Sequence, residues 1–220
     1  MGKPNIIITG DGSHSLYQGD LGESYHSVNG AIQESMHVFI ENGLSLIGKK
    51  EVCIFEMGFG TGLNAFLSLI HSEKNSMKIN YESIELFPLN FEEARVLNYP
   101  EILDYPRDLF LRLHDSEWGR KEKITQKFSL LKIQEDISSF KPENNYDVIF
   151  FDAFSADVQP HIWEKAIFIK LYEALNQGGI LSTYSSRGVF RRVLEDIGFK
   201  VEKIPGPPGK RHITRAVKSF

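Results

Sequence analysis

A glycine-rich loop after a short apolar stretch is the pattern in this sequence best suited to binding a ligand. Residues 56–64 read Glu-Met-Gly-Phe-Gly-Thr-Gly-Leu-Asn and follow the apolar residues 52–55. Gly58, Gly60 and Gly62 permit a tight turn and let a ligand approach the backbone where any side chain would clash. The glycines alternate, whereas a nicotinamide dinucleotide site has Gly-x-Gly-x-x-Gly. The loop therefore predicts a ligand site and disfavours a dehydrogenase.

The pattern acid-x-Gly-x-Gly-x-Gly resembles the first motif of class I S-adenosylmethionine-dependent methyltransferases. That resemblance implies that the loop from Glu56 to Asn64 contacts the amino-acid end and the ribose of the cofactor. Glu85 lies 23 residues after Gly62, near the offset expected of an acid that accepts from ribose hydroxyls. The resemblance also implies that Asp136 accepts from the adenine amino group, with Glu135 as a weaker candidate. Glu85 or Asp136 could instead cap a helix or lie in a solvated loop.

Asp152 follows the apolar residues 148–151 and precedes Ala153 and Phe154. A carboxylate can orient the N–H bonds of an amine, while a nearby aromatic ring excludes water or contacts a cation or a base. This arrangement favours methylation of a nitrogen atom, with Asp152 as the catalytic residue and Phe154 against the substrate. Asp152 could also simply cap the turn that follows it.

Strands and helices alternate along the middle of the chain. Hydrophobic runs predict strands at 52–55, 79–86, 128–133, 147–151 and 180–184. Helical spacing follows Gly62, Pro88 is placed at the start of a helix reaching about Leu97, and residues 163–174 form a third helix ended by Gly178 and Gly179. This alternation predicts an α/β fold of the Rossmann-like class, with a mostly parallel sheet and ligands at the carboxyl ends of its strands.

Both ends of the chain depart from that alternation. Residues 1–45 predict a small N-terminal cap, made of a hairpin around Gly10-Asp11-Gly12, a polar loop and a helix. Residues 46–220 form the methyltransferase-like domain, with an insertion near 99–127 whose structure the pattern does not predict. A helix closed by Gly198 precedes strands at 200–204 and 212–218, which predict an antiparallel C-terminal hairpin.

Composition and charge limit the size of the domain, its partners and its location in the cell. The 220 residues are 41% hydrophobic and 25% charged, which suits one large globular domain. The formal net charge is −4, yet the segment from Tyr184 to the C-terminus contains nine Lys or Arg residues and only three Asp or Glu residues. Such a basic block suits contact with a polyanion, or is a solvated surface. The single cysteine, the lack of a leader pattern and the lack of a bilayer-length apolar run predict a cytoplasmic protein that does not enter a membrane.

Over nearly its whole length the sequence resembles the MnmC/MnmD tRNA methyltransferases, most specifically in its N-terminal block. The stretches that carry the resemblance are Asp11-Gly12-Ser13, Glu23-Ser24-Tyr25-His26-Ser27, residues 29–35, His37-Val38-Phe39, residues 56–64, Asp152-Ala153-Phe154, Tyr184-Ser185-Ser186 and residues 205–211. The resemblance implies methylation of 5-aminomethyl-(2-thio)uridine at the wobble position of tRNA, with Tyr25 and Ser27 closing the cap over the ligands. The basic residues expected to contact tRNA are Arg187, Arg191, Arg192, Lys210 and Arg211.

The family resemblance also predicts what this chain lacks. Bifunctional members carry an FAD-dependent oxidase domain after this one, and 220 residues leave no room for it. We therefore expect S-adenosylmethionine as the methyl donor, without FAD. His14, His26 and His37 match no usual metal-ligand spacing, and methyl transfer from a sulfonium needs no metal. No metal site is expected, and the oligomeric state is not predicted.

Other functions stay open at this stage. An aminopropyltransferase of the spermidine-synthase type joins a similar fold to an amine, although its Gly-Gly-Gly-Asp-Gly loop is absent here. A methyltransferase acting on a small-molecule amine would use the same carboxylates. A non-catalytic RNA-binding module would explain the basic tail, yet it has no need for acids placed after successive strands.

Overall fold

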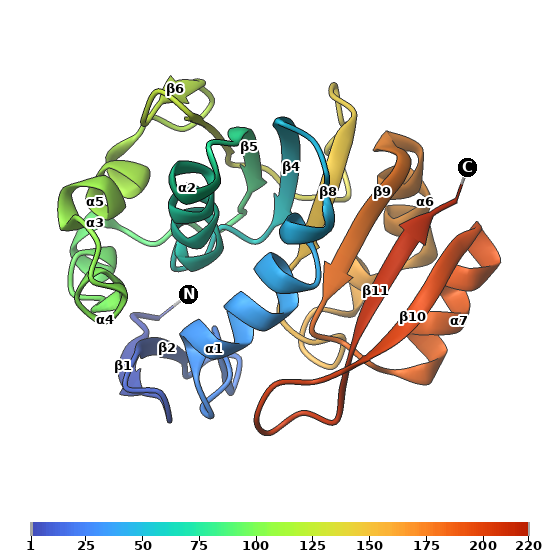
Figure 1. Cartoon of the computed structure of the whole chain (residues 1–220). Helices are drawn as coiled ribbons and strands as arrows, with labels where there is room; N and C mark the ends of the chain where they lie inside the picture. Colours follow the sequence, from blue (N-terminus) through green and yellow to red (C-terminus); the bar gives the residue numbers. More distant parts are fainter. Residues whose placement is uncertain (1, 220) are drawn as a thin grey trace.

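The computed structural model describes residues 2–219, which are organised around an eight-stranded sheet (Figure 1). The strands of this sheet are β4 (Glu51–Met57), β5 (Lys78–Ile84), β6 (Glu122–Lys123), β7 (Phe128–Ile133), β8 (Tyr146–Phe151), β9 (Leu175–Thr183), β10 (Phe199–Pro205) and β11 (His212–Lys218). Their order across the sheet is β10-β11-β9-β8-β4-β5-β7-β6. Strands β9, β8, β4, β5 and β7 pair in parallel, and β11 pairs antiparallel with both β9 and β10.

Helices cover both faces of this sheet. The helical segments are α1 (Ala31–Ser35), the π-helical η1 (Met36–Glu41), the 3-10 segment η2 (Leu44–Leu46), α2 (Leu63–Asn75), α3 (Phe91–Ala94), α4 (Tyr99–Leu103), α5 (Arg107–Asp115), the 3-10 segment η3 (Pro160–Trp163), α6 (Lys165–Ala174) and α7 (Gly188–Ile197). One core cluster joins α1, η1, α2 and α5 to one face, and a second joins α6 and α7 to the other. The predicted α/β class and the C-terminal hairpin are therefore confirmed.

The N-terminal segment forms its own small sheet. Strands β1 (Asn5–Ile8) and β2 (His14–Gln18) pair around the predicted turn, and β3 (Glu23–Ser24) pairs with β2. The helix that follows packs on the main sheet, where the rings of Phe39 and Phe150 lie 5.2 Å apart. Because this helix shares a core with the sheet, residues 1–45 are joined to the rest by packing as well as by the chain. Their treatment as a separate cap stays a prediction.

Two predicted helix boundaries were wrong. The helix expected from Pro88 to Leu97 is only the short α3, which starts after Asn90 because Asn90 and Glu93 form a capping box. The helix expected to end at Gly178-Gly179 ends at Ala174, and both glycines lie inside β9. Pairing of β9 with β8, rather than local glycine content, decides where that helix stops.

The insertion near 99–127 folds against α2. Phe110 of α5 is fully buried, and its ring lies 5.2 Å from that of Phe66. From the same helix, the Nε2 atom of His114 donates to the carbonyl oxygen of Thr61 over 3.1 Å. The insertion therefore supports the glycine loop from behind. Within the described residues, no helix is long and apolar enough to cross a membrane.

Candidate active site

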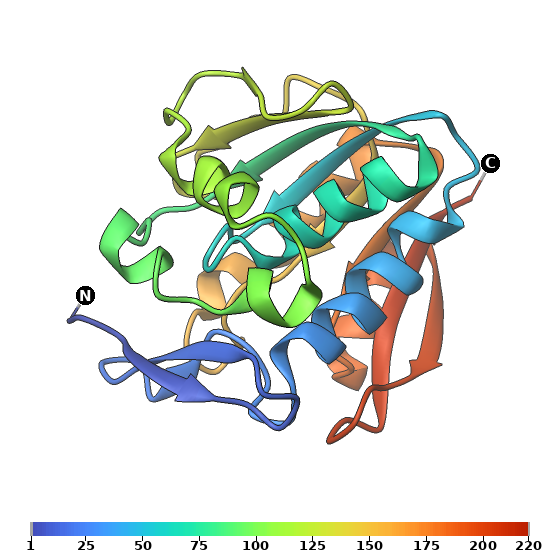
Figure 2. The ribbon, with the colours of Figure 1, turned by 60° about the vertical axis from the view of Figure 1, so that its left-hand side comes forward.

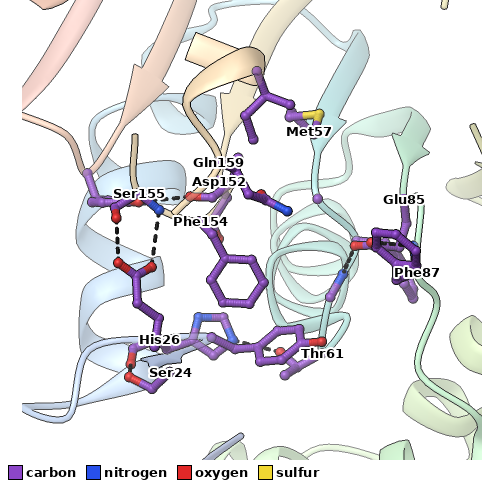
Figure 3. Close-up of a pocket in the computed structure, with 18 of the residues that line it drawn as sticks. Ser24, His26, Met57, Thr61, Glu85, Phe87, Asp152, Phe154, Ser155 and Gln159 are labelled. Atoms are coloured by element: carbon purple, nitrogen blue, oxygen red, sulfur yellow. Dashed lines mark hydrogen bonds between the residues drawn. The ribbon is translucent and has the colours of Figure 1, made fainter. Parts of the chain in front are cut away.

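A cavity of about 490 Å³ opens at the carboxyl ends of the parallel strands. It collects side chains from the N-terminal segment, the strand ends and the C-terminal hairpin, and Figure 3 shows Phe154 projecting into it between Asp152 and Glu85. The predicted residues that line it are Tyr25, Ser27, Gly58, Gly60, Asn64, Glu85, Asp136, Asp152, Phe154 and Lys210. Tertiary structure therefore brings together most of the residues selected from sequence.

The glycine loop needs glycine for two different reasons. Gly58 and Gly60 have positive φ angles of 93° and 48° and line the cavity. A Cβ atom at Gly58 would lie 2.7 Å from the carbonyl oxygen of Asp152, and one at Gly60 would lie 3.1 Å from the ring of Tyr25. Gly62 does not line the cavity; a Cβ atom there would lie 2.7 Å from Nε2 of His114. Gly62 therefore serves packing against the insertion.

Glu56 lies behind the cavity and does not line it. The side chain is fully buried, and Ser83 donates a hydrogen bond from Oγ to its Oε2 over 2.7 Å. Burial raises the pKa of Glu56 to about 8, with the nearby Asp152 acting in the same direction. Its Oε1 atom has no hydrogen-bond partner among the described residues. Its direct contact with a cofactor stays a prediction.

Backbone amides fix the carboxylate of Glu85. Its Oε2 accepts from the amide of Gly60 over 3.2 Å, and its Oε1 accepts from the amide of Phe87 over 2.9 Å. Burial raises the pKa of Glu85, whereas these amides lower it. The glycine loop and the end of β5 are thereby held together. Asp136 lines the same cavity and caps its own turn, because its Oδ1 accepts from the amide of Ser138 over 2.7 Å.

Asp152 is partly buried at the end of β8, next to Phe154. Its Oδ2 accepts from Nδ2 of Asn64 over 2.8 Å. Burial raises the pKa of Asp152 to about 7; the Asn64 hydrogen bond and Lys210 lower it, and Glu34 raises it. The ring of Tyr25 meets that of Phe154 edge to face, with centroids 5.0 Å apart. A carboxylate and two rings therefore border one end of the cavity.

Sequence analysis missed Glu34 and Tyr184 as side chains of this site. Both line the cavity. Glu34 Oε2 accepts from the amide of Ser27 over 2.9 Å, and the hydroxyl of Tyr184 donates to the carbonyl oxygen of Ala153 over 2.8 Å. Glu34 lies in the 29–35 stretch of the family resemblance, but its spacing is that of an ordinary helix and did not single it out. Tyr184 ends the strand predicted at 180–184 and begins the Tyr184-Ser185-Ser186 stretch of the family resemblance, and these were its signals.

The basic residues expected to contact tRNA differ in whether they line the cavity. Lys210 lines the cavity, where its Nζ lies 2.5 Å from Oε1 of Glu34. Arg187 forms an exposed ion pair with Asp157. Arg191, Arg192 and Arg211 do not line the cavity. Desolvation lowers the pKa of His212, and the nearby charges of Lys203, Arg191 and Arg211 act in the same direction. Positive charge therefore lies beside the hairpin loop.

His14, His26 and His37, from which no metal site was expected, have separate contacts. His26 Nε2 lies 2.7 Å from Oγ1 of Thr61, whereas His14 contacts the carbonyl of Val96 and His37 that of Pro205. Over residues 2–219, no group of three His, Cys, Asp or Glu side chains is arranged to hold a metal ion.

A sequence profile of S-adenosyl-L-methionine-dependent methyltransferases matches residues 110–219, which is half of the chain. The chain belongs to this methyltransferase family. S-Adenosyl-L-methionine is therefore the methyl donor, and the enzyme is a methyltransferase of the α/β type that its fold displays.

Curated relatives of this methyltransferase are longer proteins. It is 31% identical over 212 residues to the "tRNA 5-methylaminomethyl-2-thiouridine biosynthesis bifunctional protein MnmC" of Nitrosospira multiformis, covering 90% of this chain and 34% of the relative. The protein of the same name from Methylobacillus flagellatus is 28% identical over 209 residues, covering 89% of this chain and 32% of that protein. The chain thus spans about a third of the length of these relatives.

Solved structures agree on the fold of the methyltransferase. The crystal structure of MNMC2 from Aquifex aeolicus superposes with a TM-score of 0.81 at 28% identity, covering 98% of this chain and 70% of that one. Spermidine synthase from Thermotoga maritima superposes with a TM-score of 0.57 at 14% identity, covering 99% and 72% respectively. The second likeness concerns the fold alone.

The site of the methyltransferase suits its methyl donor. Gly58 and Gly60 leave the backbone open to the cavity at the end of β4. The Oδ1 atom of Asn64 is buried beside them without a hydrogen-bond partner among residues 2–219, and an unpaired buried acceptor suits an ammonium donor. An acidic lining also suits a ligand that carries a sulfonium and an ammonium group.

Proposed function

We propose that this methyltransferase converts 5-aminomethyl-(2-thio)uridine at the wobble position of tRNA to 5-methylaminomethyl-(2-thio)uridine. The observation that carries the proposal is the placement of Asp152 and Phe154 at one end of the cofactor cavity, with Asp152 bonded to Asn64 beside the glycine loop. The names of the curated relatives, which match about nine tenths of this chain, support the nucleoside assignment.

The methyl donor, when bound, supplies an electrophilic methyl group on a sulfonium. In this proposal Gly58 and Gly60 leave room for its amino-acid end, and Glu85 accepts from its ribose hydroxyls. Asp136 accepts from the adenine amino group. Tyr25, whose ring contacts both Gly60 and Phe154, and Ser27 close the cavity from the N-terminal side and exclude water.

Asp152 orients the amine in this proposal. A primary amine with a pKa near ~10.4 is neutral in only about one molecule in a thousand at neutral pH, a cost on the order of 4 kcal/mol. Only the neutral amine attacks, and the resulting secondary ammonium then releases a proton to Asp152 or to water. Alignment of nitrogen with the methyl carbon and exclusion of water are the main contributions of the protein. Phe154 provides the apolar wall on which the base rests.

The tRNA requires contacts beyond one nucleoside. Arg192 and Arg211 are exposed outside the cavity, and Arg191 and Lys203 add charge near His212. Because residue 210 lines the cavity and residue 211 lies outside it, the charged hairpin loop adjoins the proposed base site. These side chains can neutralise phosphates on either side of the wobble nucleotide. Arg187 would have to exchange Asp157 for a phosphate.

A direct assay tests the proposal. The protein is incubated with S-adenosyl-L-methionine and tRNA that carries 5-aminomethyl-2-thiouridine, and the digested nucleosides are analysed by mass spectrometry. We expect 5-methylaminomethyl-2-thiouridine from the wild type and little from Asp152→Asn. Decarboxylated S-adenosylmethionine and free small amines, offered in parallel, test the aminopropyltransferase and small-molecule alternatives. Absence of the methylated nucleoside, from a protein that binds the methyl donor, would overturn the assignment.

A further inference from the structure

The N-terminal helix and the C-terminal hairpin meet over the cavity. Figure 2 shows the loop between β10 and β11 beside the start of α1. Lys210 Nζ lies 2.5 Å from Oε1 of Glu34, and His37 Nε2 lies 2.8 Å from the carbonyl oxygen of Pro205. Lys210 Nζ also lies 4.1 Å from the ring centroid of Tyr184. The ammonium of Lys210 is therefore held between a carboxylate and an aromatic face.

Lys210 is unlike the other charged residues of this cavity. The acids that line it are Glu23, Glu34, Glu85, Glu135, Asp136 and Asp152. In the part of the chain that the structure describes, Lys210 is the single lysine or arginine of the lining. The other titratable side chains of the lining are Tyr17, Tyr25, His26, His161 and Tyr184, and Glu56 is buried behind Asp152. The lining of the cavity thus contains one cationic side chain and six carboxyl groups.

A short path of contacts connects Lys210 with Asp152. The hydroxyl of Tyr184, under the Lys210 ammonium, donates to the carbonyl oxygen of Ala153, the residue after Asp152. Glu34, which holds Lys210, is itself held by the amide of Ser27. The two charges act on Asp152 in opposite directions: Glu34 raises its pKa, and Lys210 lowers it to a smaller extent. The pair therefore faces the end of the cavity where the amine is proposed to bind.

We propose that Glu34 and Lys210 are a pair of positioning residues: Glu34 holds the Lys210 ammonium over Tyr184, and this positive charge favours the ionised form of Asp152 and the neutral form of the substrate amine, while the negative charge of Glu34 opposes both effects. The inference rests on the proposed function. An ionised carboxylate and a neutral amine form the productive combination. An acidic cavity without a cation would favour the opposite state, a protonated carboxyl or an ammonium, which cannot attack.

Titration of Asp152 itself tests this pair without any substrate. Protein labelled with ¹³C-aspartate is titrated by NMR, and the carboxyl signal of Asp152 is assigned from the Asp152→Asn variant. We expect Lys210→Met to raise the pKa of Asp152, and Glu34→Gln to lower it, each by about one unit, because the first removes a cation and the second an anion. Lys210→Arg should restore the wild-type value. Lys200→Met removes an exposed cation elsewhere on the hairpin and should shift nothing.

The same variants are then compared in methyl transfer. The acid limb of kcat/KM against pH should move upward in Lys210→Met and downward in Glu34→Gln, and circular dichroism and affinity for the methyl donor show whether each variant is folded. A pair that only supports the fold, without acting on the charge of the site, would leave the pKa of Asp152 and the acid limb unchanged. Equal titration of Asp152 in all variants, or shifts in the same direction, would overturn the inference. Opposite shifts from a protein that methylates no aminomethylated tRNA would instead contradict the proposed function.

Discussion

Asn64 Nδ2 donates a hydrogen bond of 2.8 Å to Asp152 Oδ2, between residues 88 positions apart in the chain. Asn64 lies in the first turn of α2, directly after the glycine loop, and Asp152 ends β8. The bond therefore couples the part of the site proposed to hold the methyl donor to the part proposed to hold the amine. A change at Asp152 should therefore affect alignment more than affinity for the methyl donor.

Replacement of Asp152 tests that coupling. We expect Asp152→Ala to reduce turnover on aminomethylated tRNA by roughly 10²-fold or more, with a much smaller change in affinity for S-adenosyl-L-methionine, because a positioning group acts mainly in the transition state. Single-turnover methylation and calorimetry measure the two effects. Wild-type turnover in this variant would remove Asp152 from the mechanism.

Cofactor binding should depend on Gly60 and Glu85. A side chain at Gly60 would meet the ring of Tyr25 at a φ of 48°, and Glu85 is the acid fixed beside it. Gly60→Val and Glu85→Ala should each weaken binding of S-adenosyl-L-methionine, roughly tenfold or more, while the fold persists. Gly48→Val is the matched control, because no atom lies within 4 Å of its Cβ position. Unchanged affinity in both test variants would contradict the cofactor assignment.

The charge beside the hairpin loop should govern the salt dependence of tRNA binding. We expect Arg191→Ala/Arg192→Ala, and separately Arg211→Ala, to raise the KM for tRNA without changing affinity for the methyl donor. Each lost phosphate contact should flatten the log-log salt slope by about one unit. Arg120→Ala removes an exposed arginine from the insertion and serves as the control. If the test variants keep the wild-type slope, the basic block is only a solvated surface.

Stability should depend on pH through Glu56. Burial raises its pKa from 4.5 to about 8, so folding takes up a proton between these values. Below pH 4.5 Glu56 is protonated in both the folded and the unfolded state and does not change the free energy of unfolding. As the pH rises from 4.5 toward 8, the unfolded state loses this proton first, and the free energy of unfolding falls.

Replacing Glu56 with glutamine should remove this pH dependence. Glu56→Gln should gain stability relative to the wild type across pH 4.5 to 8, on the order of a few kcal/mol, because one pKa unit corresponds to about 1.4 kcal/mol. Denaturant unfolding at several pH values measures the difference. Glu51→Gln, an exposed acid on the same strand, should show the wild-type dependence. A Glu56→Gln curve parallel to that of the wild type would show that Glu56 is ionised in the folded protein.

Local pattern was enough to predict the sheet and its acids. Apolar runs alternating with helical spacing imply parallel strands, and parallel strands end at one edge of a sheet. Residues at or just after the ends of such runs, such as Gly58, Glu85 and Asp152, must therefore gather there whatever the details of packing. The same reasoning failed at Gly178 and Gly179, because strand pairing overrides the local preference of glycine for a turn.

Tertiary structure alone decided which distant side chains complete the cavity. Glu34 and Lys210 come from opposite ends of the chain, and neither follows a strand of the parallel core. Their meeting depends on how a helix docks on the sheet and how far a hairpin loop extends, and no local periodicity encodes either quantity. The insertion that supports Gly62 through His114 is a second example. The short-range sequence pattern is enough to predict where the strands end. Side-chain contacts between separate elements follow only from the packing of the whole chain.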